Sequence, residues 1–127
     1  MFWFKRNNMN GIDLLVSKQK QFISILMELS QILTNSGNNA QSEFIAELVD
    51  IISANNYTLF VQEINSVAMW GGAGAVWEVY IQDIDESDKF NKAMLRIILL
   101  MEEVNILGKG IKPLKKFFKS NNKGWGC

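Results

Sequence analysis

Apolar residues recur at intervals of three and four over most of this chain, the spacing that places side chains on one face of a helix. The first helix is predicted between Gly11 and Gly37. Asp13 is its expected N-cap or first-turn acid, and Gly37 is its expected C-terminal end. Its inward face would consist of Leu15, Phe22, Ile25, Leu26, Leu29, Ile32 and Leu33.

Two further helices are predicted before the middle of the chain. One covers residues 40–56, with Asn39 as its N-cap and the Asn55-Asn56 pair at its end. The next covers residues 58–70 and would be capped by Thr58. The expected inward residues of this pair of helices are Phe44, Ile45, Leu48, Ile51, Ile52, Leu59, Phe60, Ile64, Val67 and Ala68.

The second half of the chain contains the strongest helical pattern, over residues 85–108, with Ser87 or Asp88 as the cap. Its inward residues would be Phe90, Met94, Leu95, Ile98, Met101 and Leu107. A short basic amphipathic segment follows over residues 111–122.

Residues 68–80 read AMWGGAGAVWEVY and interrupt these helices. Gly71, Gly72 and Gly74 lie between Trp70 and Trp77. A dinucleotide-binding turn would need a third glycine where Trp77 stands and a preceding strand, and the chain has no P-loop motif. We therefore interpret the glycines as a structural turn that lets the two tryptophans pack closely. Aromatic residues beside such a turn are also candidate anchors for a partner.

The segment after the glycines is ambiguous. Residues 76–84 read VWEVYIQDI, and their β-propensity favours a short strand or hairpin, whereas the start of another helix stays open. The length of 127 residues suits one domain. The sequence thus predicts an all-α, single-domain bundle of about four main helices over residues 1–127, with 1–10 as an N-terminal lead and 120–127 as a loose C-terminal tail.

Acidic residues gather at the end of this segment and directly after it. Asp83, Asp85 and Ser87 match the first ligand positions of an EF-hand loop, but Asp88 stands where that loop requires glycine, and Met94 stands where it requires glutamate. Calcium binding is therefore not expected. Acids at a helix start interact favourably with the helix dipole, which accounts for them without a metal.

Charge is segregated along the chain although the net charge is zero. Residues 21–88 contain ten acidic and no basic residues, and residues 89–127 contain nine basic residues and two acidic ones. Zero net charge argues against a dedicated nucleic-acid binder. The basic segment 109–123 could lie on an anionic membrane or contact nucleic acid. It could also pack its phenylalanines on the core with its lysines near the acidic block, and this docking is what we expect.

Several chemistries are excluded by composition. The chain has no histidine, which removes histidine acid–base catalysis and imidazole metal ligands, and its one cysteine, Cys127, removes internal disulfides and multi-thiolate zinc sites. No enzyme activity, metal or cofactor is therefore expected. No apolar run approaches the roughly 20 residues of a membrane span, no signal peptide is recognised, and the apolar start at Phe2–Phe4 is too short for stable membrane anchoring. A cytoplasmic location is expected.

The stretch from Phe44 to Val104 resembles a family of small bacterial helical proteins of unassigned function, in which a helix leads to a GGMGS-like turn, a short apolar stretch with an acidic residue, and another helix. The matching residues are Gly71, Gly72, Gly74, Ala75, Val76 and Glu78. Here Ala73 replaces the usual methionine, Ala75 the usual serine and Trp77-Glu78 the usual Asn-Asp. Such proteins resemble immunity proteins, which protect the producing cell from its own toxin.

The resemblance implies a protein-binding module that neutralises a cognate bacterial toxin. Its acidic surface would steer association with a basic toxin. The candidate partner-binding residues are Trp70, Trp77, Glu78, Asp83, Asp85, Glu86 and Asp88. A structural or adaptor module with another protein partner is the alternative, and a small enzyme that works through carboxylates or a bound cofactor is a third reading.

Overall fold

The computed structural model describes residues 12–123, and most of them are helical. In chain order the elements are α2 (Ile12–Ser17), α3 (Gln19–Asn35), α4 (Asn39–Ser53), α5 (Tyr57–Ile64), α6 (Val67–Trp70), the 3-10 helix η1 (Val76–Glu78), α7 (Ile84–Glu103), the 3-10 helix η2 (Lys109–Ile111) and α8 (Lys112–Lys123). The described residues contain no strand. The predicted all-α class is confirmed.

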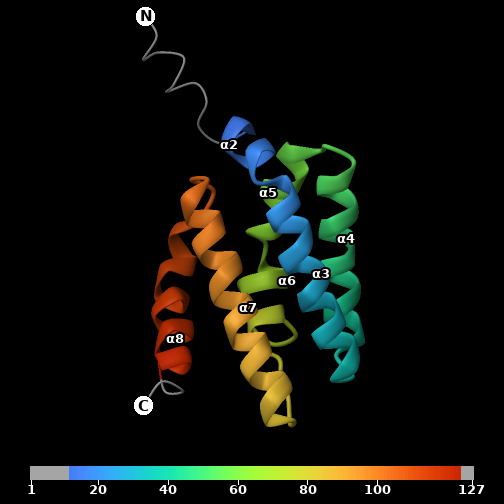
Figure 1. The fold of residues 1–127 in the computed structure, drawn as a ribbon, viewed down its shortest axis with the longest axis vertical. Coiled ribbons are helices and arrows are strands. Elements are labelled where there is room, and N and C mark those ends of the chain that lie inside the picture. The colour runs from blue at the N-terminus through green and yellow to red at the C-terminus, as the bar shows by residue number, and fades with distance from the viewer. Residues whose placement is uncertain (1–11, 124–127) are drawn as a thin grey trace, which may run out of the picture.

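The four long helices lie next to one another in the order α8, α7, α3, α4, and each contacts its neighbours (Figure 1). α3 and α4 run antiparallel, as do α7 and α8 (Figure 1). Between the two pairs, residues 54–83 lead the chain from one end of the bundle to the other and carry α5, α6 and η1 (Figure 1). This arrangement confirms a helical bundle of about four main helices.

The core is built mostly from the apolar stripes that the sequence predicts, but the predictions of Val67 and Ala68 as inward residues are wrong, because both are exposed after the helix is interrupted at Asn65. All seven expected inward residues of the first helix are buried, from Leu15 to Leu33. Phe22 of α3 packs edge-to-face against Phe60 of α5, with ring centroids 5.4 Å apart, which joins the shorter elements to the long helices. Full burial of each such side chain stabilises the fold by about 1.5–3 kcal/mol relative to exposure.

The predicted first helix is divided at Lys18 into α2 and α3. The amide of Lys18 donates to the carbonyl of Leu15, only three residues back, at 3.0 Å, so the backbone tightens there and the helix changes direction. The C-terminal end is as predicted. Gly37 has a φ of +82°, and the amide of Asn38 donates to the carbonyl of Leu33 at 2.8 Å, which satisfies an otherwise unpaired helix carbonyl.

Two predicted caps lie at neighbouring positions in the structure. α4 begins at Asn39 itself, and Asn38 is the residue before it, so the prediction of Asn39 as cap is wrong by one position. Thr58 is also not a cap, because α5 begins at Tyr57 and the side chain of Asn56 accepts a hydrogen bond from an amide of the first turn. The sequence offers several short polar residues at each helix start, and only backbone geometry selects one.

The predicted third helix is divided at Asn65 into α5 and α6. The Asn65 side chain donates to the carbonyl of Ile106 at 2.9 Å and accepts from the amide of Gly108 at 3.0 Å. These bonds tie the end of α5 to the loop that precedes α8. By interrupting the helix, Asn65 thus satisfies backbone groups of Ile106 and Gly108. The spacing of apolar residues along the sequence does not reveal such a contact.

The strand or hairpin considered after the glycines is not formed. Residues 76–78 form η1, residues 79–83 lead without regular structure to α7, and no strand lies alongside them in the described chain. Val76 and Ile81 are buried as separate apolar contacts. A strand needs a partner for its backbone hydrogen bonds, and local β-propensity cannot supply one.

The basic segment forms α8 and docks on the bundle, as predicted for its phenylalanines, although only in part. Phe118 is fully buried, with its ring 6.4 Å from that of Phe90, whereas Phe117 is 46% exposed. Lys115 pairs with Glu102 at 2.8 Å, outside the acidic block of residues 21–88 that was expected to receive it.

The predicted loose C-terminal tail is shorter than expected. Residues 120–123 belong to α8, so the prediction of a tail from residue 120 is wrong for this part. The predicted lead over residues 1–10, with Phe2–Phe4, and Cys127 at the opposite end lie outside the described residues.

The contact between Lys115 of α8 and Glu102 of α7 predicts a lowered pKa of Glu102 that can be measured. The hydrogen bond from Lys115 holds the pKa of the Glu102 carboxyl below its usual 4.5, and the positive charges of Lys115, Lys112 and Lys119 act in the same direction. Replacing Lys115 with glutamine should return the pKa of Glu102 toward 4.5, as measured by carboxyl NMR titration. Because the folded-state pKa is the lower one, the stabilisation from this pair is present above pH 4.5 and is lost as the pH falls through the folded-state pKa.

Lys116→Gln is the matched control for this titration, because Lys116 lies one position further on, points to solvent and does not act on Glu102. It should leave the Glu102 pKa lowered. An equal pKa in the wild-type protein and the Lys115→Gln variant would contradict the observed contact.

Candidate functional site

The start of α7 carries the acidic residues that the sequence singles out. Asp83 is the N-cap of this helix, with its side chain accepting a hydrogen bond from the amide of Glu86 at 2.9 Å. The predicted cap at Ser87 or Asp88 is therefore wrong, because α7 begins four or more residues earlier than that cap requires. A carboxylate here satisfies a free amide and faces the positive end of the helix dipole.

Lysines of the first turns of α7 partly neutralise this acidic group. Glu86 pairs with Lys89 at 3.1 Å, and Asp88 pairs with Lys92 at 3.0 Å. The hydrogen bond that Lys89 donates to the Glu86 carboxylate, followed by the negative charge of Glu86, raises the pKa of Lys89. Asp85 is exposed and has no ion pair within residues 12–123. Among the acids at the start of α7, the negative charge that is accessible to a partner thus lies on Asp83, Asp85 and the unpaired oxygen of Glu86.

The rest of the acidic block is spread over the bundle. Glu28 of α3 pairs with Arg96 of α7 at 2.9 Å and joins the two helices. Glu43, Glu47 and Asp50 follow one exposed line along α4. The ten carboxylates therefore do not converge on one surface, as a single steering patch would require.

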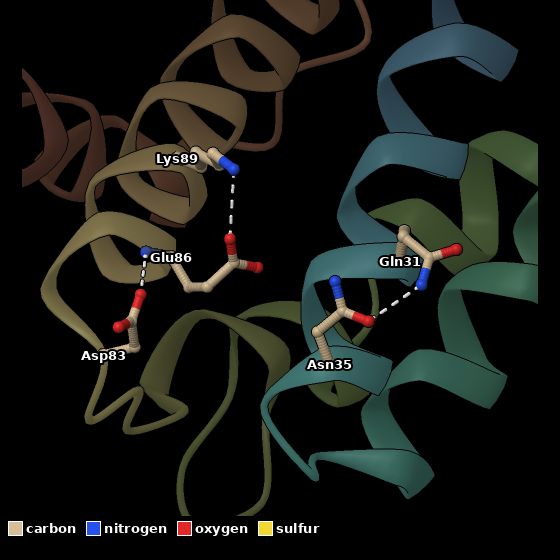
Figure 2. A network of polar contacts seen from close by, with 5 residues as sticks. All are labelled: Gln31, Asn35, Asp83, Glu86 and Lys89. Carbon is tan, nitrogen blue, oxygen red and sulfur yellow. Dashed lines mark hydrogen bonds and ion pairs between the residues drawn. The ribbon is translucent and has the colours of Figure 1, made fainter.

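An open hollow separates the start of α7 from the end of α3. It has a volume of about 600 Å³, and its walls include Asn35 and Ser36 on one side and Ile81, Asp83 and Glu86 on the other. Figure 2 shows the facing polar groups: Asp83 and Glu86 on α7 lie across from Gln31 and Asn35 on α3, which are hydrogen-bonded to each other at 2.9 Å. The hollow is wide enough to receive a side chain of a partner.

Two large apolar side chains project to solvent beside this hollow. Tyr80 is 79% exposed and Ile84 is 65% exposed, and Ile84 also lines the hollow. The backbone of Tyr80 is held to the start of α4, since its carbonyl accepts from the side chain of Asn38, the residue before that helix, at 3.4 Å. We call Tyr80, Asp83, Ile84, Asp85 and Glu86 the α7-start surface. Sequence reasoning missed Tyr80 and Ile84 because it considered residues 76–84 only as a short strand or the start of a helix; their four-residue separation around an acidic cap was the available signal.

The tryptophans have a different environment. Both are partly buried, and each indole N–H donates to a nearby backbone carbonyl: Trp70 to Ile64 at 2.6 Å and Trp77 to Gly71 at 2.8 Å. The Trp77 ring also packs edge-to-face against Phe117 of α8 at 5.9 Å. The fold thus uses the polar group of each indole, and Trp77 lies against α8. Glu78, between Trp77 and α7, is exposed.

The three glycines form the turn that places Trp77. A Cβ atom added at Gly71 would lie 2.6 Å from the carbonyl oxygen of Val67, and Gly74 has a φ of +88°. The carbonyl of Gly74 accepts from the Gln41 side chain at 2.9 Å, which fastens the turn to α4. Gly72 has open space around it. The fold alone therefore explains why glycine occupies positions 71 and 74.

Neither a metal centre nor a membrane span is found in the part of the chain that the structure describes. Within residues 12–123, no three Asp, Glu, His or Cys side chains are grouped closely enough to hold a metal ion. None of the described helices is long and apolar enough to cross a bilayer. Comparisons of this chain with protein-family models, curated proteins and solved structures find no match.

Proposed function

We propose that this chain is a non-catalytic protein-binding module, an immunity protein that binds and neutralises a cognate bacterial toxin. The observation that supports this function best is the α7-start surface, where Tyr80 and Ile84 are exposed beside an open hollow and are flanked by carboxylates. The family resemblance of the glycine turn supplies the class of partner. The surface supplies the place where that partner would bind.

The chemistry of the α7-start surface suits a basic protein. Large aromatic and aliphatic side chains that become desolvated at the centre of an interface contribute most of its binding free energy. Surrounding carboxylates raise the association rate with a positively charged partner and disfavour acidic ones. Tyr80 and Ile84 would provide the anchors, and Asp85 an exposed charge that has no ion pair within residues 12–123.

The direct test starts from the genes adjacent to this one: a toxin that one of them encodes would be co-expressed with this chain. The wild-type chain should bind the toxin and protect the cells, and Tyr80→Ala should weaken the complex about tenfold or more, as measured by calorimetry. Asp85→Lys should lower the association rate several-fold at low salt, with a smaller effect at high salt. Asp85 is the informative acid because Asp83 caps α7 and Glu86 pairs with Lys89.

Glu47→Lys is the matched control, since Glu47 is an exposed acid of α4 that has no ion pair within residues 12–123. It makes the same change in net charge and should leave the association rate close to that of the wild type. Equal slowing by Asp85→Lys and Glu47→Lys would refute the α7-start surface. Failure of the wild-type chain to bind or neutralise the toxin would refute the immunity function, and binding of a different protein would favour the adaptor alternative.

A further inference from the structure

α8 has one side buried and one side that carries only positive charge. Phe118 is fully buried and Leu114 is partly buried. Lys112, Lys116 and Lys119 recur at four- and three-residue spacing on the opposite side and are exposed, and Lys109 of η2, also exposed, lies just before them in the chain. We call these four residues, Lys109, Lys112, Lys116 and Lys119, the basic stripe.

No acidic side chain of the described chain neutralises the basic stripe by an ion pair. Within residues 12–123, the α8 lysine that forms one is Lys115, which points away from the stripe toward Glu102 of α7. Glu102 does lie near Lys112 and Lys119, since these two lysines help to lower its pKa, but it forms its ion pair with Lys115 and none with the stripe. The stripe therefore has positive charge available for a partner.

Apolar and aromatic groups lie next to the basic stripe. Phe117 is about half exposed on the flank of α8 and packs against the partly buried ring of Trp77. Near the start of α8, Val67 is 81% exposed and lines a hollow with Trp70 and Ile111. Lysines beside aromatic rings and a few exposed apolar side chains are the composition found at membrane–water interfaces.

We propose that the basic stripe and the neighbouring Phe117 bind the surface of a membrane that contains anionic phospholipids. Lys112, Lys116 and Lys119 cover about two turns of α8, about 11 Å at 1.5 Å per residue, and α8 is an outer helix of the bundle (Figure 1). Such a row matches a surface of many negative headgroups. Because Phe118 and Leu114 remain in the bundle, the contact is electrostatic and reversible, without insertion of a helix.

The same residues fit nucleic acid less well. Sequence-reading proteins use the planar forks of Arg, Asn and Gln, and single-strand binders use free aromatic faces. The basic stripe consists of lysines, and the Phe117 ring is engaged edge-to-face with both Trp77 and Phe118. A lysine ammonium acts as a compact point charge, which needs no geometric match to a headgroup.

Vesicle sedimentation of the full chain tests this assignment. The protein should cosediment with vesicles of phosphatidylcholine and phosphatidylserine at low salt, dissociate as salt is raised, and remain in the supernatant with pure phosphatidylcholine. Lys116→Gln with Lys119→Gln should lower the partition coefficient roughly thirtyfold. The control pair, Lys89→Gln with Lys92→Gln, removes two exposed helix lysines at the same three-residue spacing and should leave binding within about twofold.

Three outcomes would overturn the proposal. Equal binding to charged and uncharged vesicles would exclude recognition of anionic headgroups. Equal weakening by the two lysine pairs would show that net charge acts without the stripe. Tighter binding of the wild-type chain to a short DNA or RNA duplex than to the charged vesicles, measured at the same salt concentration, would assign the stripe to nucleic acid instead.

Discussion

Replacing Phe118 with alanine should lower the free energy of unfolding by about 3–5 kcal/mol. The ring is fully buried, with its centroid 6.4 Å from that of Phe90 on α7 and 5.1 Å from that of Phe117. Its removal leaves a cavity between α7 and α8 that rigid helices cannot close completely. Since small domains are stable by about 5–15 kcal/mol, this loss is a large part of the total. Urea unfolding followed by circular dichroism measures it.

Phe117→Ala is the matched control, because the two phenylalanines are adjacent and Phe117 is 46% exposed. It should cost only about 1 kcal/mol, from partial burial and the edge-to-face contact with Trp77. Hydrogen exchange should also become faster over α8 in the Phe118 variant and change little in the Phe117 variant. Similar losses for the two substitutions would mean that α8 is not held to the bundle by Phe118.

The part of the fold that could be predicted is the part where apolar residues repeat at helical spacing. The buried stripe of α3 and most of that of α7 can be read from three- and four-residue spacings, since a helix with one apolar face must bury that face somewhere. Single-residue events have no such repetition. The break at Lys18, the cap at Asp83 and the interruption at Asn65 each depend on where one amide finds an acceptor. That choice is made by the assembled backbone.

The candidate site shows the same division. The carboxylates Asp83, Asp85 and Glu86 are visible as an acidic run before a helix, but their accessible charge depends on which lysines pair with them. The β-propensity around Tyr80 and Ile84 favoured a short strand, with a helix start left open, but local β-propensity forms no strand without a neighbouring one. Whether an apolar residue is exposed is a property of the whole fold.

Gly71→Ala should lower the free energy of unfolding by about 1–3 kcal/mol. The added methyl group would lie 2.6 Å from the Val67 carbonyl oxygen and 2.9 Å from its Cβ, closer than van der Waals contact allows. Gly71 also donates its amide to that carbonyl at 2.7 Å and accepts the indole N–H of Trp77, so the backbone cannot move aside without loosening both bonds. Thermal and urea unfolding measure the loss.

Gly72→Ala is the matched control, one residue along the same turn, with nothing within 4 Å of the added methyl group. It should leave stability unchanged or raise it slightly, because alanine restricts the unfolded chain more than glycine. Gly74→Ala should fall between the two, with a cost of about 1–2 kcal/mol from its φ of +88°. Equal costs at Gly71 and Gly72 would contradict the close approach to Val67.

The glycine series also separates a structural turn from a binding loop. The contacts of Gly71 and Gly74 lie within the fold, and the proposed partner surface lies at the start of α7. At a temperature where Gly71→Ala remains folded, its affinity for the proposed toxin partner should therefore equal that of the wild type, whereas Tyr80→Ala should bind weakly at unchanged stability. A Gly72→Ala variant that folds normally but no longer binds the partner would move the binding site to the turn itself.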